Sequence, residues 1–193
     1  MLYEKVKKTV EEHSLLQKGD TVICAVSGGA DSMCLLTLMQ KLGKEMGFTV
    51  AAANLNHCLR GSESDGDSQF VETVCEIKGI PFYGKKVQVD IIAKARGLSL
   101  EEAGREERYK FFDELSAKLG GAKVATGHNI SDNAETVLFR LARGSGAKGL
   151  CGIRYKRGNI IRPLLDVSRK EIEKYLVENA VMWREDSSNS QMC

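Results

Sequence analysis

The sequence predicts an α/β fold, a doubly wound, mostly parallel five-stranded sheet with helices on both faces. Short apolar runs alternate with longer segments of helical periodicity along the 193-residue chain. This alternation implies right-handed crossovers and a parallel sheet that is covered on both sides. Internal repeats and low-complexity segments are absent from the sequence. We therefore expect one compact α/β unit.

Five segments are expected to form strands, because each is short, apolar and bounded by glycine, proline or polar residues. The expected strands are residues 21–27, 49–56, 82–89, 123–126 and 159–164.

Five longer segments beyond the N-terminal residues 1–20 are expected to form helices. Val137, Leu138 and Leu141 share one face of the fourth helix, and Ser168 followed by Glu171 forms a capping box that starts the fifth. The expected helices are residues 31–45, 64–78, 99–119, 131–141 and 168–179.

Composition excludes several classes of protein. The chain has 28 basic and 26 acidic residues, a net charge of +2 and a hydrophobic fraction of 42%, typical of an ordinary globular domain. The nearly balanced net charge does not indicate nucleic-acid binding, although local basic patches could still bind a nucleic acid. No apolar run is long enough to cross a membrane, and residues 1–8 lack the apolar core of a signal peptide. We expect a cytoplasmic protein without a membrane partner.

The six cysteines are scattered and include no C-x-x-C pair. This usage indicates reduced thiols in a cytosolic setting and argues against a disulfide framework. It also argues against a zinc or iron–sulfur site bound by cysteine.

A small-sided polar loop, AVSGGADS over residues 25–32, follows the first expected strand and opens the next helix. Ligands of open parallel sheets bind where strands lead into helices. Gly28 and Gly29 let successive N–H groups form an anion-binding nest, and Ser27 and Ser32 add hydroxyl donors. The alternative is a strand–helix turn that is rich in glycine for steric reasons alone.

Asp31 and the spacing of the glycines limit which kinds of phosphate-binding loop this can be. A carboxylate beside a phosphate requires Mg²⁺, unless Asp31 caps the helix. The patterns G-x-x-x-x-G-K-[ST] and G-x-G-x-x-G are both absent, which argues against a Walker-type loop and weakens a dinucleotide interpretation.

The motif S-G-G-x-D-S, complete at residues 27–32, resembles the pyrophosphate loop (PP-loop) of the ATP pyrophosphatase superfamily. The resemblance implies an enzyme that splits ATP between its α- and β-phosphates and adenylates a carbonyl oxygen. It also implies that the loop residues bind ATP. These residues are Ser27, Gly28, Gly29, Ala30, Asp31 and Ser32.

Further stretches at residues 54–65, 99–109, 125–146 and 161–189 resemble the N-terminal domain of the tRNA(Ile)-lysidine synthase family. The resemblance implies a Rossmann-like, adenine nucleotide alpha hydrolase-like fold that uses ATP and Mg²⁺. It implies a ligase that adenylates the wobble cytidine of tRNA(Ile) with a CAU anticodon and couples L-lysine to its C2. The products are lysidine, AMP and pyrophosphate, and the family also suggests a homodimer.

The expected organisation is a single PP-loop domain over residues 1–193. Residues 1–20 form an N-terminal helix, residues 21–180 the core, and residues 181–193 a tail that leads toward C-terminal domains absent from this chain. Two positions depart from the family pattern, Gly104 where alanine is usual and Asn133 where glutamine is commoner.

Arg105 and Arg108 share one face at the start of the 99–119 helix. The resemblance gives them a catalytic role, since cations stabilise the charge that develops on a transferred phosphoryl group. The alternative is a solvated salt-bridge face, with Glu101 four residues before Arg105.

His128 and Asp132 flank a helix start at the end of the fourth expected strand, and Glu135 lies one turn further on. The resemblance makes them catalytic, with the two carboxylates holding either the lysine ammonium or Mg²⁺. Asp132 could equally be an ordinary acidic residue at a helix N-terminus.

Two other groups complete the candidate site. His57 and Arg60 follow the second strand, where the superfamily binds adenine and ribose, although His57 could be a packed core residue. Arg140, Arg143 and Lys148 surround flexible glycines and suit phosphate contacts to tRNA, with a solvated charged loop as the alternative.

Two other functions stay open on sequence grounds. One is a tRNA thiolase of the same superfamily, against which the missing C-x-x-C pair argues. The other is a catalytically inert nucleotide- or RNA-binding module, which would have no need of Asp132 and Glu135.

Overall fold

The computed structural model describes residues 1–144 and 151–185, which form an α/β fold around one sheet. The sheet has six strands in the order β3-β2-β1-β4-β6-β5, so the expectation of five was wrong. The first five in this order are parallel to their neighbours, and β5 is antiparallel to β6. The strands are β1 (Thr21–Ala25), β2 (Thr49–Asn56), β3 (Phe82–Lys86), β4 (Lys123–Ala125), β5 (Lys156–Arg157) and β6 (Ile160–Ile161).

Strand β5 escaped the sequence analysis because its two residues, Lys156 and Arg157, are charged and exposed. Only pairing with Ile161 and Ile160 of β6 makes them a strand. An edge strand of this length carries no apolar pattern.

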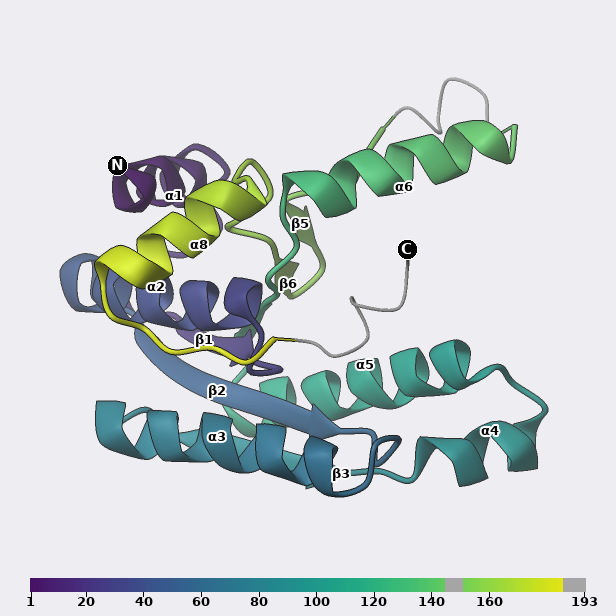
Figure 1. The fold of residues 1–193 in the computed structure, drawn as a ribbon. Coiled ribbons are helices and arrows are strands. Elements are labelled where there is room, and N and C mark those ends of the chain that lie inside the picture. The colour runs from purple at the N-terminus through teal and green to yellow at the C-terminus, as the bar shows by residue number, and fades with distance from the viewer. Residues whose placement is uncertain (145–150, 186–193) are drawn as a thin grey trace.

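Helices cover both faces of the sheet (Figure 1). The main core joins α1, α2, α3 and α8 to one face through residues such as Val22 and Cys24, and α5 covers the other face at Ile23. Alternate residues of β1 therefore point into opposite layers, as strand geometry requires. The helices are α1 (Leu2–Glu12), α2 (Ala30–Met46), α3 (Ser62–Lys78), α4 (Val89–Arg96), α5 (Leu100–Lys118), α6 (Ile130–Ala142) and α8 (Arg169–Glu178).

Helix α4 replaces the end of an expected strand. The segment 82–89 leaves the sheet after Lys86, and Val89 begins a helix. Val89 and Ala93 are buried against Ala103 of α5 in a separate small cluster. Tertiary packing against α5 thus stabilises a short helix that the apolar run did not predict.

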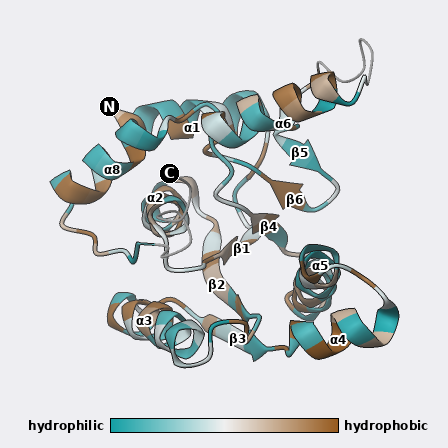
Figure 2. Cartoon of the chain, turned by 45° about the vertical axis from the view of Figure 1, so that its right-hand side comes forward, coloured by the Kyte–Doolittle hydropathy of each residue, from teal (hydrophilic) through white to brown (hydrophobic). Residues whose placement is uncertain are grey.

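Helix α6 is formed as expected, but its apolar face is not covered by the described residues. No residue of α6 is buried, and Leu138 and Leu141 are 65% and 48% exposed. Figure 1 shows α6 extending away from the sheet, and Figure 2 shows hydrophobic residues toward its far end. Helical periodicity predicted the element correctly but not its burial.

Within the described residues, no helix is long and apolar enough to span a membrane. Three cysteines, Cys24, Cys34 and Cys75, are free and buried in the core. Burial raises the pKa of Cys34 to about 12 and that of Cys75 to about 11, so both remain neutral thiols that pack as apolar groups.

Candidate functional site

A cavity of about 470 Å³ opens at the carboxyl ends of β1, β2 and β4. The loop after β1 forms its floor, and α5 and the loops after β2 and β4 form its walls. Arg169 and Arg184 reach it from the C-terminal part of the described chain. This is the edge of the sheet at which ligands of open parallel sheets bind.

The loop after β1 is held by its two serines. Ser32 Oγ donates to the carbonyl of Gly29 at 2.9 Å and accepts from the backbone N–H of Ser27 at 3.2 Å, and the two serine hydroxyls lie 3.3 Å apart. Ser27, Gly29, Ala30 and Ser32 all line the cavity. Ser32 therefore fixes the shape of the loop as well as facing the cavity.

The first helical amides of α2 have no side-chain cap. Its N-cap residue is Gly29, whereas α5, α6 and α8 each begin with a complete capping box. Uncapped amides at a helix N-terminus, together with the helix dipole, favour an anionic ligand. The predicted capping role of Asp31 is not observed, because Asp31 lies inside the helix.

Gly28 adopts a left-handed φ of +96°, which explains why glycine is needed there. Its own carbonyl accepts a 2.9 Å hydrogen bond from the backbone of Arg184. Gly28 therefore shapes the loop and does not itself line the cavity.

Asp31 is the acidic group at the floor of the cavity. Its Oδ2 atom lies 2.8 Å from Nη1 of Arg169, and its Oδ1 atom is buried without a hydrogen-bond partner. Burial raises the pKa of Asp31 above its usual range, against the opposing effect of Arg169. A buried carboxylate oxygen without a partner fits a ligand to Mg²⁺, which uses one or two carboxylates together with substrate phosphates.

The α5 wall of the cavity is cationic. Arg105 and Arg108 both line it, and among the described residues neither is paired with a carboxylate. Arg105 contacts Tyr109, with 3.3 Å between Nη2 and the phenol oxygen, while Arg108 Nη2 lies 3.4 Å from Nε2 of His57. The salt bridges of the alternative interpretation are therefore not observed among the described residues, although both side chains are exposed. The catalytic role of these two arginines stays a prediction.

His57 lines the cavity, and its buried Nδ1 has no hydrogen-bond partner. Burial and then the charge of Arg108 lower its pKa below the usual range. The ring also faces Gly104, where an added Cβ would lie 3.4 Å from it. His57 is thus a wall of the cavity and not a residue of the apolar core.

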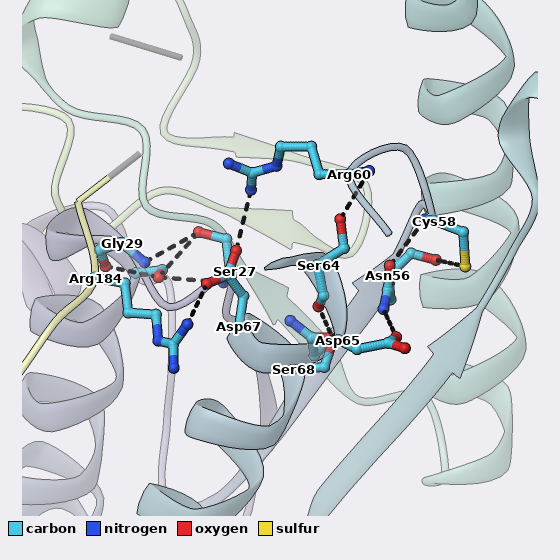
Figure 3. Close-up of polar contacts among 12 residues, drawn as sticks. Ser27, Gly29, Asn56, Cys58, Arg60, Ser64, Asp65, Asp67, Ser68 and Arg184 are labelled. Atoms are coloured by element: carbon cyan, nitrogen blue, oxygen red, sulfur yellow. Dashed lines mark hydrogen bonds and ion pairs between the residues drawn. The ribbon is translucent and has the colours of Figure 1, made fainter. Parts of the chain in front are cut away.

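Arg60 lies outside the lining of this cavity. Its guanidinium pairs with Asp67 of α3 at 3.0 Å, and Asp67 also pairs with Arg184 at 3.1 Å (Figure 3). The backbone of Arg60 donates to Ser64 Oγ at 3.2 Å. These contacts hold the loop after β2 close to the loop after β1, and an ATP contact by Arg60 stays a prediction.

His128, in the loop after β4, and Asp132, in the first turn of α6, both line the cavity. Thr126 Oγ1 lies 2.8 Å from Nδ1 of His128, and burial, with Arg162 next in effect, lowers the pKa of His128. Asp132 also closes the capping box of α6, accepting from the backbone of Asn129 at 2.7 Å. Asp132 therefore has the ordinary role of an acidic residue at a helix start and also lines the cavity.

The remaining predicted residues are less closely grouped. Glu135 is exposed and is not part of the cavity lining. Arg140 lies at a second cavity, where Nη1 donates to the carbonyl of Cys151. Arg143 stacks 3.9 Å from the centre of the Phe139 ring, and Lys148 lies outside the described residues. The roles predicted for all four stay predictions.

Several residues of the site carry no role in the sequence analysis. Asn54 is buried and donates to the carbonyl of Val26 at 2.7 Å, which ties β2 to the loop after β1. Arg169, Arg184 and Tyr109 also line the cavity. Arg184 lies within the stretch 161–189 that carries the family resemblance, but nothing local in the sequence shows that it folds back onto the loop after β1.

The fold and the site define a nucleotide-binding α/β domain with a glycine-containing phosphate loop at the first strand–helix junction. The chain belongs to the PP-loop domain family, whose model matches residues 2–192.

Several curated proteins to which the chain is similar are tRNA(Ile)-lysidine synthases. The chain is 45% identical to the enzyme of Clostridioides difficile over 98% of this chain and 41% of that protein. It is 44% identical to that of Clostridium tetani over 95% of this chain and 40% of the relative. The chain therefore spans about two fifths of the length of the curated relatives that it matches.

Two solved structures show the same fold at low identity. The U34-tRNA thiolase NcsA from Methanococcus maripaludis aligns with a TM-score of 0.74 and 21% identity, over 95% of this chain and 63% of that one. The NH3-dependent NAD synthetase from Campylobacter jejuni aligns with a TM-score of 0.58 and 20% identity, over 92% and 73%.

Proposed function

We propose that this chain binds ATP in the cavity at β1 and transfers its adenylyl group to a base of tRNA(Ile), as the first half of lysidine formation. One observation carries the proposal: the PP-loop, the unpaired Arg105 and Arg108, and His128 with Asp132 all line one cavity. Adenylyl transfer needs phosphate binding, charge stabilisation and substrate positioning, and these three groups supply them in that order.

The loop residues and the uncapped start of α2 suit the triphosphate. The hydroxyls of Ser27 and Ser32 and the amides beginning at Gly29 supply donors to phosphate oxygens. Asp31, through its unpartnered Oδ1, would hold Mg²⁺. A bound Mg²⁺ would offset phosphate charge as pyrophosphate leaves.

Arg105 and Arg108 suit the reacting phosphate, because they line the α5 wall of the cavity and have no acidic partner among the described residues. A guanidinium without a carboxylate can give its full charge to a ligand. His57, neutral and beside Arg108, suits contact with adenine or ribose.

His128 and Asp132 suit the tRNA base and the lysine. The depressed pKa of His128 keeps its ring neutral at pH 7, so Nε2 can accept or donate one proton at the base. Asp132 keeps carboxylate capacity beyond its capping bond and can bind the lysine ammonium. Glu135, one turn further along α6, is the second proposed lysine contact.

The lysidine product, the tRNA(Ile) substrate and the L-lysine co-substrate come from the relatives, which are named tRNA(Ile)-lysidine synthase at 40–45% identity. A cytoplasmic location and a homodimer are part of the same proposal. The thiolase alternative has less support, because the relatives at 40–45% identity are named tRNA(Ile)-lysidine synthase.

The first experiment is calorimetric titration of ATP into the protein with and without Mg²⁺. We expect saturable binding that Mg²⁺ strengthens, and loss of the Mg²⁺ effect in Asp31→Asn. Asp113→Asn, an exposed change of the same kind on α5, is the control. Absence of any saturable heat in the wild-type protein would overturn the proposal.

The second experiment tests the reaction itself. The protein is mixed with ATP, labelled lysine and a tRNA(Ile) transcript with a CAU anticodon, and AMP, pyrophosphate and labelled tRNA are measured. Lysine incorporation supports lysidine formation. Sustained pyrophosphate release that gives no lysine-labelled tRNA, although lysine is present, would point to another PP-loop modifier.

A further inference from the structure

A second cavity, of about 490 Å³, adjoins the first and is strongly cationic. The two cavities share Arg105, Tyr109 and His128 as a common wall. Four more arginines line the second cavity, and none of the described residues that line it is acidic. They are Arg140, Arg154, Arg157 and Arg162.

These four guanidiniums are not neutralised by the described part of the chain. None of them is paired with a carboxylate there, although many surface lysines and arginines of the same chain are. Arg140 and Arg162 instead donate to backbone carbonyls, those of Cys151 and Arg154 respectively. Backbone carbonyls position a guanidinium without cancelling its charge.

Arg162 is the most unusual member of the group, since it is only 7% exposed. Its Nη1 donates to the carbonyl of Arg154 at 2.7 Å, while its Nε is buried without any hydrogen-bond partner. A buried donor on a charged group is costly to leave unsatisfied. An anion in this cavity would satisfy that need.

The position of the cavity indicates where its ligand comes from. A strand lying in it would pass Tyr109 and His128 and reach the cavity proposed for ATP. Single-stranded RNA is commonly bound by guanidiniums on its phosphates and aromatic rings on its bases. A single free phosphate would occupy only a small part of the volume.

We propose that this second cavity binds a backbone phosphate of single-stranded RNA, with Arg162 as its buried anchor and the exposed Arg154 and Arg157 at its entrance. The proposal depends on the proposed function and extends it from the ATP cavity to the RNA strand. None of these three arginines lines the ATP cavity, so ATP binding and RNA binding can be tested separately.

The test measures binding of a fluorescent RNA hairpin with a CAU loop over a series of salt concentrations. The variants are Arg162→Met and the double change of Arg154 and Arg157 to glutamine, which alters only exposed side chains. Lys156→Gln is the matched control, because Lys156 is exposed on the same hairpin but does not line the cavity.

We expect about tenfold weaker RNA binding in the double variant and in Arg162→Met, as for loss of charge-assisted hydrogen bonds. The slope of log K against log salt should fall by about 0.7 for each RNA phosphate that the variant no longer neutralises. Affinity for ATP should stay at the wild-type value, and Lys156→Gln should bind RNA as the wild type does.

Three outcomes would overturn the inference. They are no RNA binding by the wild type, a double variant that matches Lys156→Gln, or pyrophosphate binding that the arginine changes abolish while RNA binding persists. The last would identify a site for free phosphate. Absence of ATP binding by the wild-type protein would instead overturn the proposed function, and the RNA titration would still test the second cavity.

Discussion

Arg184 and Asp67 join two distant parts of the chain, with 3.1 Å between Nη1 and Oδ1. The backbone N–H of Arg184 also donates to the carbonyl of Gly28. The segment after α8 is thereby attached both to α3 and to the PP-loop (Figure 3). The guanidinium of Arg184 consequently lies at the edge of the proposed triphosphate site.

Replacement of Arg184 by glutamine should weaken ATP binding by about three- to tenfold, as for removal of one charge–phosphate interaction. The fold should persist, because the anchoring bond to Gly28 comes from the backbone. Titration calorimetry gives the affinity, and Lys174→Gln, which removes an exposed charge on α8, is the control. Equal affinity in the two variants would show that Arg184 does not contact the nucleotide.

Gly28 and Gly29 should respond differently to alanine. Gly28→Ala forces a side chain into a φ of +96° and should lower the free energy of unfolding by about 1–2 kcal/mol. At Gly29 φ is −73° and an added Cβ makes only an ordinary contact with Ser27 Oγ at 3.6 Å. Urea unfolding of both variants measures the difference, and equal losses would contradict this account of the loop.

Gly104→Ala should stabilise the protein by up to about 1 kcal/mol, because alanine favours the interior of helix α5. The added Cβ would lie 3.4 Å from the ring of His57, which is close but leaves room for a small shift. Urea denaturation measures the change. A loss of stability would show that the His57 ring is fixed too firmly to move.

Stability should depend on the protonation of His128. Its folded-state pKa lies below the unfolded value of about 6.5, so the unfolded chain binds the proton more readily. The contribution is therefore fully present above about pH 6.5 and is lost as the pH falls toward the folded-state pKa.

His128→Asn should reduce the stability difference between about pH 7.5 and pH 5.5, since the variant has no imidazole to titrate there. The difference that remains should come mainly from His57, whose pKa is also lowered by burial. Urea unfolding at the two pH values gives the comparison. An unchanged difference would mean that His128 titrates alike in the folded and unfolded chain.

Local sequence signals were enough for most of the architecture. Strand β2 occupies Thr49–Asn56 as predicted, and α8 begins with the predicted Ser168–Glu171 capping box. Both depend on residues close in the sequence. The strand follows from the alternation of its side chains, and the helix start follows from hydrogen bonds between side chains and the backbone. The two-residue β5 and the turn of α4 onto α5 depend on distant partners and were missed.

The sequence by itself determined the parallel sheet, the phosphate loop at its first strand and the family, because apolar periodicity and a contiguous motif are local properties. Only the tertiary structure decided that Asp31 pairs with Arg169, that Arg184 returns to the loop, and that arginines gather around a second cavity whose described lining has no carboxylate. These relations join residues far apart in the chain. Their distances follow from how the helices pack on the sheet, which no local pattern encodes.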